Sequence, residues 1–405
     1  MNLKILVLSF ISVSMIVPAT GQQGTDSGPE QGSYYPMPDS LAQLVIANNR
    51  SMKTAREAYS VATLEAGTGN TPPNPEVQLG YLFGKPAEIG NRIDFAVTQE
   101  IDFPTSYIHR SRARELKIAK AALTVDLTRQ ELLLQTARLW IERVYLNRME
   151  KMIQERLSQA DKLLAHYRQQ LSVGEIGQLA FSQSNLQSAS LKGELSTIKA
   201  GIRQNQVALE EITGNTGMEV KDTLLPPSQP IDPDSLKSAY MAAPLMQYFK
   251  REVDLTEQKR QLATSLSLPK ISAGYYSESV LTEQFRGFQV GITLPLWEHS
   301  NRIKLAKSEV VFAEADAERM ASQLLKEVNQ LIGQWESLRQ IILELEEALS
   351  QVNDMELLNL AWEQGEISLA EYMVGSDLYF RNLQSLWSYR KDLLLVEAEL
   401  HRVYY

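Results

Sequence analysis

The chain has 405 residues, a formal net charge of −9 at pH 7 and no cysteine. The absence of cysteine excludes disulfides, thiolate metal sites, a cysteine nucleophile and lipid attachment through an N-terminal cysteine. No cluster of lysine and arginine stands out, so we expect no nucleic-acid partner.

The first residues have the pattern of a secretory signal. Lys4 precedes the apolar run "ILVLSFISVSMIVPA", and the small residues Ala19 and Gly21 fit a cleavage after Gly21. The alternative, a membrane anchor, needs roughly 20 apolar residues, and this run is shorter. The sequence therefore predicts a signal peptide over residues 1–21 and export of the mature chain.

Two parts of the remaining chain resemble each other. "PNPEVQLGY" is followed 194 residues later by "SLPKISAGY", "FAVTQEIDFP" 191 residues later by "GFQVGITLP", and "LSVGEI" 191 residues later by "WEQGEI". The pairs keep the same order, which indicates an internal duplication into two large halves. We expect a first repeat over 22–213, a linker over 214–234 and a second repeat over 235–405.

Each repeat contains two stretches in which apolar and polar residues alternate, the pattern of a strand. They predict strands over 76–84 and 92–103 in the first repeat and over 270–280 and 285–296 in the second. In "RIDFAVTQEIDFP", Asp94, Glu100 and Asp102 lie on the face opposite the apolar residues.

A very long helical stretch follows the second strand of each repeat. Apolar residues recur every seven positions over 106–173 and 299–364, which predicts long helices that coil around neighbours. Glycines at 174 and 365 end them, and shorter helices return over 178–213 and 369–401. Two further helical segments, about 38–67 and 235–266, supply the missing length beside the return helices.

Strands with one apolar and one polar face are usually the half-buried edge of a soluble sheet. Four strands beside such long helices fit a membrane barrel better, because in lipid only a closed barrel satisfies the hydrogen bonds of strand backbones. Three copies of the chain would supply twelve strands. Phe103, Tyr107 and Trp297 near the strand ends would suit an aromatic girdle at the membrane interface.

At this point the sequence resembles the TolC-like family of outer-membrane efflux proteins, the outer-membrane components of tripartite efflux systems. The resemblance covers the duplicated order of hairpin, long helix, glycine turn and return helix. The telling segments are "VTQEIDFP" before "RSRARELKIAKAAL", "VGITLPLWEHSNRIKLAKSEV", and "WEQGEISLAEYMVGSDLYFRNLQSLWSYRKDLLLVEAEL".

The resemblance implies a mainly α fold with a small β part, made of duplicated long antiparallel helices and four amphipathic strands. It implies a homotrimer whose 12-stranded barrel lies in the bacterial outer membrane and continues into a periplasmic α-helical tunnel. The implied function is passive conduction of substrates. The implied partners are outer-membrane lipid, a periplasmic adaptor protein and an inner-membrane pump of the RND type.

The resemblance also implies roles for particular residues. Gly174, Glu175, Gly365 and Glu366 would lie at hairpin tips that contact the adaptor, and Glu371 would contribute to an acidic periplasmic gate. An equally open reading makes Glu371 a solvated helix residue. Asp94, Glu100 and Asp102 are expected to face the barrel lumen.

Other functions fit less well. A duct for type I protein secretion would use the same architecture, and a structural periplasmic coiled coil or adhesin would explain the heptads but not the strands. No phosphate loop, metal-ligand spacing or Ser/His/Asp arrangement occurs. We therefore expect no enzyme activity, cofactor or metal site.

Overall fold

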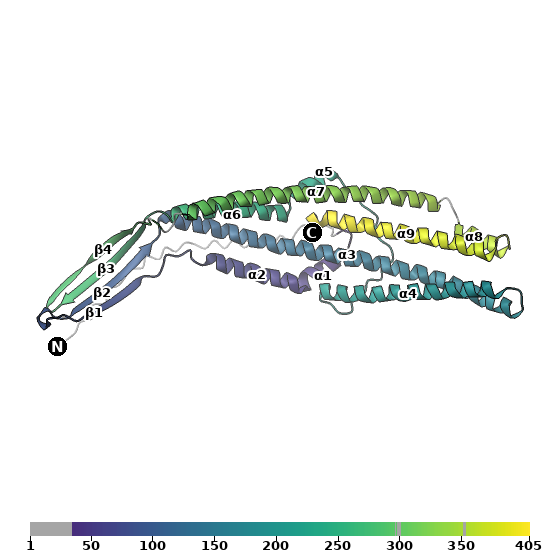
Figure 1. Ribbon diagram of the computed structural model, residues 1–405, viewed down its shortest axis with the longest axis horizontal. Helices are drawn as coiled ribbons and strands as arrows, with labels where there is room; N and C mark the ends of the chain where they lie inside the picture. Colours follow the sequence, from purple (N-terminus) through teal and green to yellow (C-terminus); the bar gives the residue numbers. More distant parts are fainter. Residues whose placement is uncertain (1–34, 296, 298–300, 351–353) are drawn as a thin grey trace. The chain divides into compact units, whose positions relative to one another are not determined.

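The described part of the protein is mainly helical and contains one small sheet (Figure 1). A computed structural model describes residues 35–295, 297, 301–350 and 354–405, all within one compact unit, Tyr34–Tyr405. The predicted fold class, mainly α with a small β part, is confirmed. The predicted signal peptide, residues 1–21, lies outside the described residues.

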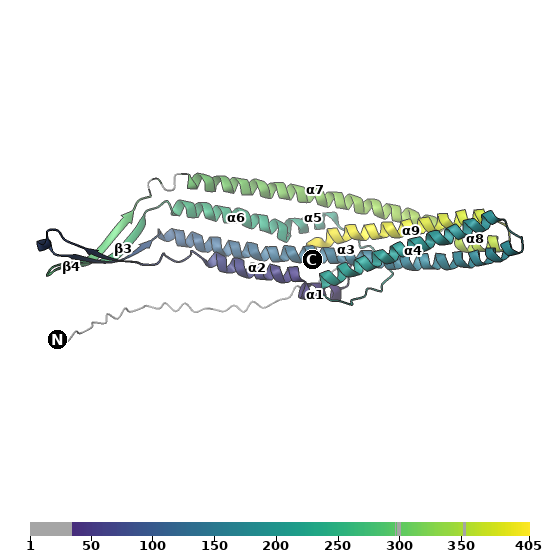
Figure 2. The same ribbon diagram turned by 60° about the horizontal axis from the view of Figure 1, so that its bottom comes forward.

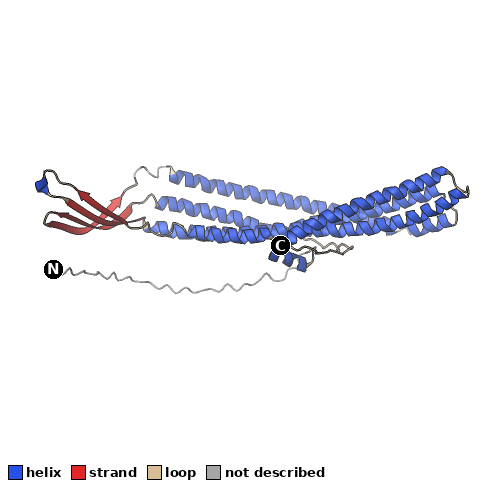
Figure 3. Cartoon of the chain, turned by 90° about the horizontal axis from the view of Figure 1, so that it is seen from below, coloured by secondary structure: helices blue, strands red, loops and turns tan. Residues whose placement is uncertain are grey.

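The sheet, drawn in red in Figure 3, has four antiparallel strands. Their order in the sheet is β1-β2-β3-β4. The strands are β1 (Glu76–Leu82), β2 (Arg92–Ile101), β3 (Lys270–Val280) and β4 (Glu283–Thr293). The two hairpins join through β2 and β3, where Val97 lies opposite Tyr275. Strands β1 and β4 therefore form the two outer edges of the sheet.

Four strand ends differ from the predicted ranges by two or three residues, and local hydrogen bonding accounts for those of β2 and β4. Strand β2 was predicted to reach Phe103, but the backbone N–H of Asp102 donates to the Tyr107 hydroxyl at 3.2 Å instead of to a strand. Strand β4 was predicted over 285–296. It starts at Glu283, which pairs with Val280, and ends before Pro295, which has no N–H to donate. Strand β1 ends at Leu82 instead of residue 84.

The longest helix, α3 (Pro104–Ser172), starts two residues before its predicted position. Proline is well suited to the first helical turn because its missing N–H would be unpaired there in any case. The seven-residue repeat marks the packed side of α3: Leu132, Ile153, Ala160 and Tyr167 are all buried. The return helices are α4 (Gln178–Thr213) and α9 (Leu369–His401).

The second long helix, predicted as one element over 299–364, is recorded as two helices, α7 (Arg302–Ser350) and α8 (Asp354–Glu363). Residues 351–353 between them lie outside the described part. The remaining helices are two consecutive pairs: α1 (Asp39–Asn48) with α2 (Arg50–Gly67), and α5 (Pro233–Ala242) with α6 (Pro244–Ser265). Short 3-10 turns occupy Ala87–Ile89 and Arg402–Tyr404.

Each pair is interrupted by a residue that starts a new helix. The Asn49 side chain accepts hydrogen bonds from the backbone N–H groups of Ser51 and Met52 and so caps α2. Pro244 occupies the first turn of α6. Helix α5 starts at Pro233, two residues before the predicted start of the second repeat at residue 235.

Four helices repeat the order of the strands. Helix α2 packs on α3, α3 on α6, and α6 on α7, so the row α2-α3-α6-α7 runs parallel to the order β1-β2-β3-β4 (Figure 2). Helices α4 and α9 also pack against α3, and α9 packs against α7. Helix α3 therefore lies at the centre of the helical packing, while α2 and α7 are the outer members of the row.

The main core lies where α1, α3, α4 and α9 meet. Leu133, Ile141, Val144, Leu209 and Ala398 are almost completely buried there. None of the described helices combines the length and hydrophobicity required to cross a membrane.

Candidate channel wall and hairpin tips

One face of the sheet is apolar and unusually exposed. Register places Val77 opposite Val97, Val97 opposite Tyr275, and Tyr275 opposite Phe288, all on this face. Phe288 is 91% exposed and Leu79 is 78% exposed. An exposed apolar band that crosses all four strands indicates a surface that meets lipid or another protein.

The opposite face is polar and crowded. A Cβ atom on Gly274 would lie 2.7 Å from the Thr98 side chain and 2.7 Å from the Val97 carbonyl oxygen. A Cβ on Gly291 would lie 2.5 Å from the Ser272 hydroxyl oxygen. Glycine in a strand often marks close approach of backbone or side chains, and both of these glycines lie on the polar face.

Asp94 and Glu100 lie on this polar face, and Asp102 follows the end of β2. All three carboxylates have a cationic partner. Asp94 lies 2.7 Å from Arg92, Glu100 lies 2.9 Å from Lys270, and Asp102 lies 2.5 Å from Arg110. Arg92 also lies 3.2 Å from Glu278.

Sequence reasoning missed these basic partners. The signal for Arg92 was present, because it lies two positions before Asp94 on the same strand face. The pairing of Lys270 with Glu100 depends on the register between β2 and β3. The assignment of the three carboxylates to a channel lumen stays a prediction.

The two hairpin tips have the same backbone design although they lie 191 residues apart. Gly174 and Gly365 have φ values of +79° and +73°, in the left-handed region that favours glycine. The N–H of Glu175 donates to the Gln170 carbonyl at 2.9 Å, and that of Glu366 donates to the Ala361 carbonyl at 2.8 Å. With the N–H of each glycine bonded three residues back, both tips are Schellman motifs.

The segments after the two tips differ. Ser368 and Glu371 form a capping box at the start of α9: the Ser368 hydroxyl accepts from the Glu371 N–H at 3.3 Å, and the Glu371 carboxylate accepts from the Ser368 N–H at 2.8 Å. The hydrogen bonds that the Ser368 N–H and hydroxyl donate to the Glu371 carboxylate hold its pKa below the usual range. At the corresponding place in the first repeat, Gly177 precedes α4 and provides no side-chain cap.

Exposed apolar side chains surround both tips. Val173 and Leu179 flank the first tip, and Val374 and Leu378 follow the second; all are at least 60% exposed. Glu175 and Glu366 are exposed beside their glycines. The tips therefore present mixed apolar and acidic surfaces on turns of matching geometry, and a role for them in binding an adaptor stays a prediction.

Comparison with solved structures identifies the fold as that of the TolC-like outer-membrane efflux channels. The sequence matches no family model, and no curated protein matches it. The chain is similar to solved structures in its fold, and its sequence identity to them is low.

Three solved structures illustrate this likeness. The outer-membrane protein VceC from Vibrio cholerae has a TM-score of 0.75 at 14% identity, covering 90% of this chain and 95% of that one. The outer-membrane channel OprN gives 0.73 at 13% identity, covering 90% and 89%. The CmeC channel from Campylobacter jejuni gives 0.70 at 14% identity, covering 90% and 85%.

Proposed function

We propose that this chain is one subunit of a homotrimeric outer-membrane channel that passively conducts substrates delivered by an inner-membrane pump. The twelve strands of three copies would form the membrane barrel, and the helices would form a periplasmic tunnel. The hairpin tips at Gly174, Glu175, Gly365 and Glu366 would contact a periplasmic adaptor. The fold of VceC, OprN and CmeC supports this function.

The observation that carries the proposal is a sheet that, within the described part of the chain, is open at both edges and has an exposed apolar face. The unpaired N–H and C=O groups of a strand edge can pair with another chain, and a closed ring of strands has no such edge. Since β1 and β4 are the two edges, pairing β4 of one copy with β1 of the next closes the sheet. The apolar face would then meet lipid, and the crowded polar face would line the passage.

The helices support the same pairing of copies. Helix α2 precedes β1 and α7 follows β4, so this strand pairing would bring α7 of one copy beside α2 of the next. Helices α2 and α3 form a groove lined mainly by small side chains, among them Ala55, Ala58 and Ala62. Phe312 on α7 is 73% exposed in the single chain and could fill this groove.

Cross-linking tests this arrangement, because the chain has no cysteine of its own. The double variant Tyr59→Cys/Phe312→Cys places one thiol in the α2 groove and one on α7. We expect a short bismaleimide to join copies in detergent into a ladder that ends at three. The matched control Tyr59→Cys/Leu343→Cys moves the second thiol 31 residues along α7, about 46 Å, and should not cross-link. A monomer that is soluble without detergent would contradict the proposal.

Conduction and the proposed acidic gate are tested in planar lipid bilayers. The trimer should give stepwise conductance, and a ring of three Glu371 carboxylates should favour cations. Because Glu371 also caps α9, Glu371→Gln is the sharper variant: glutamine can keep the capping box but removes the charge. Lower cation selectivity in Glu371→Gln supports the gate, whereas unchanged selectivity leaves Glu371 with a capping role alone.

A further inference from the structure

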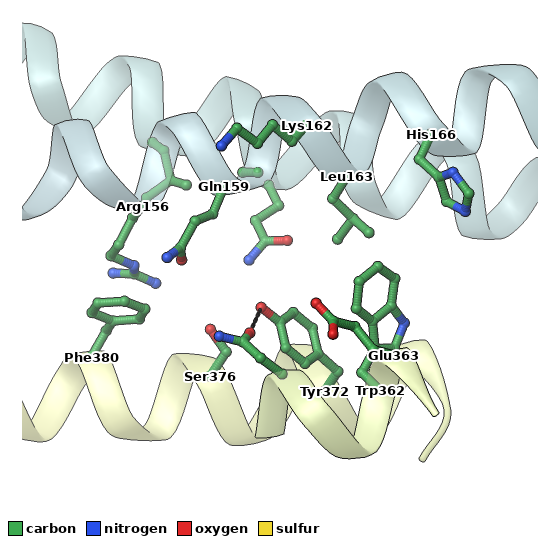
Figure 4. A pocket seen from close by; sticks show the side chains of 14 residues that line it. Arg156, Gln159, Lys162, Leu163, His166, Trp362, Glu363, Tyr372, Ser376 and Phe380 are labelled. Atoms are coloured by element: carbon green, nitrogen blue, oxygen red, sulfur yellow. Dashed lines mark hydrogen bonds between the residues drawn. The ribbon is translucent and has the colours of Figure 1, made fainter. Parts of the chain in front are cut away.

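A cavity of about 290 Å³ lies between α3 and α4 on one side and α8 and α9 on the other (Figure 4). It lies among the segments nearest the two hairpin tips, away from the sheet. Its size is at the lower end of the range for small-molecule sites. Both helical hairpins contribute residues to its lining.

Aromatic rings from the second hairpin form one side of the cavity. The rings of Trp362 and Tyr372 lie 5.4 Å apart, and Phe380 follows two turns later along α9. The Tyr372 hydroxyl already donates to Asn359 at 2.9 Å. Leu163 and Leu191 line the opposite side, so a flat apolar group would be enclosed between rings and leucines.

Basic side chains outnumber acidic ones around the cavity. Arg156, Lys162 and His166 line it together with a single carboxylate, that of Glu363. The Arg156 side chain is only 9% exposed, and its guanidinium lies 4.5 Å above the Phe380 ring. Its contact with Asp377, at 3.5 Å, leaves other N–H groups of the guanidinium available.

The hydroxyl of Ser376 is the second polar group of interest. Ser376 is only 7% exposed, lines the cavity and points toward it in Figure 4. Within the described ranges it makes no hydrogen bond with another residue. A hydroxyl that reaches a cavity and has no partner among these residues can donate a hydrogen bond to water or to a ligand there.

We propose that this cavity binds a small aromatic carboxylate. The ring would lie between Leu163 and the aromatic side chains of α8 and α9, and the carboxylate would accept hydrogen bonds from Arg156 and Ser376. The planar guanidinium suits a carboxylate better than a lysine ammonium would. The inference does not depend on the channel function, because it rests on the cavity within one chain.

Isothermal titration calorimetry of the full chain in detergent tests the proposal with benzoate as the probe. We expect one benzoate per chain and much weaker binding of benzylamine, which has the same ring and the opposite charge. Arg156→Gln should weaken benzoate binding at least ~10-fold, because it removes a charge-assisted hydrogen bond. Ser376→Ala should weaken it about 3-fold and serves if Arg156→Gln fails to fold.

Arg148→Gln is the matched control. Arg148 lies two turns earlier on α3 and stacks on Trp387 at 4.6 Å, as Arg156 stacks on Phe380, but it does not line the cavity. This variant should bind benzoate like the parent protein. The proposal is overturned if benzoate does not bind, if benzylamine binds equally well, or if affinity survives both Arg156→Gln and Ser376→Ala.

Discussion

The return helices α4 and α9 follow turns of the same design, yet they differ in how they are held. Their Schellman motifs match bond for bond, but only α9 has a capping box. Near the other end, Gln206 on α4 and Glu397 on α9 occupy positions 191 residues apart. The two helices share the backbone reversal that precedes them, which only a few residue types permit. They differ in the hydrogen bonds that their side chains make.

Gln206 and Glu397 both bind the segment that connects the two repeats, with different strength. The Gln206 amide donates to the Met218 carbonyl at 2.6 Å. Glu397 is fully buried and accepts from the Trp335 indole at 2.9 Å, the Tyr35 hydroxyl at 2.5 Å and the Ser228 hydroxyl. Burial, together with Glu397, raises the pKa of the Tyr35 hydroxyl.

The largest effect should come from Glu397→Ala. Trp335 and Ser228 would lose their acceptor, while the Tyr35 hydroxyl would keep the Pro227 carbonyl at 3.0 Å. At about 1 kcal/mol or more for each lost acceptor, we expect a loss of about 2 kcal/mol or more. Gln206→Ala at the matching position should cost about 1 kcal/mol. Urea unfolding followed by circular dichroism measures both, and equal losses would mean that the two helices are held alike.

Alanine at either tip glycine should have a smaller effect, and the same effect at both tips. A Cβ at Gly174 or Gly365 meets no atom within 4 Å, so the cost is the left-handed backbone alone, about 1 kcal/mol. Hydrogen exchange in the helical turn before each glycine should rise equally. Gly333→Ala, in open space on α7, is the control and should not raise exchange. Unequal changes in exchange at the two tips would show that the two turns differ in stability although their geometry matches.

Loss of the capping box should affect only the second tip. Ser368→Ala removes the acceptor for the Glu371 N–H, so amide exchange in the first turn of α9 should become faster. Gly177→Ser offers α4 the cap that it lacks and should slow exchange in its first turn. If Ser368→Ala leaves exchange in α9 unchanged, capping does not distinguish the two helices.

The smallest effect concerns α6, which occupies the place in the second repeat that α2 has in the first. Hydrogen bonds from Arg260 and Gln261 lower the pKa of Glu257 from 4.5 to about 2. A lowered folded-state pKa stabilises the protein above pH 4.5, and this stability is lost as pH falls toward 2. The Glu257 side chain is 35% exposed, so we expect a small effect.

Glu257→Gln should therefore flatten the dependence of stability on pH between about 4.5 and 2, and Arg260→Gln should do the same. Unfolding midpoints at several pH values measure this slope. A slope in Glu257→Gln as steep as in the parent protein would assign the acid sensitivity to other carboxylates.

The strand and helix types could be predicted because their signals extend over many residues. Alternation over 92–103 predicted a strand, and the structure has β2 at Arg92–Ile101; one hydrogen bond, from the Asp102 N–H to Tyr107, decides where it ends. Ends of this kind depend on single side chains and have no periodic signal. The order α2-α3-α6-α7 was also beyond the sequence, because it depends on contacts between distant segments.

For the candidate site, the two glycine turns were easier to predict from the sequence than the hydrogen-bond partners of the charged residues. Gly174 and Gly365 could be found because a backbone reversal after a long helix favours glycine. The capping role of Glu371 had a readable signal, a serine three residues before it. Glu397 had none, since its donors Tyr35, Ser228 and Trp335 lie 62 to 362 residues away.

The matching order of strands and helices has a consequence for the width of the proposed passage. Neighbouring strands lie about 4.8 Å apart, whereas packed helices lie about 8–10 Å apart. A ring with equal numbers of both is therefore narrower where it is made of strands, even when a tilt of about 45° widens each strand's share. The narrowest fixed part of such a passage would therefore be the part made of strands. That part begins on the far side of Pro104, the first residue of α3.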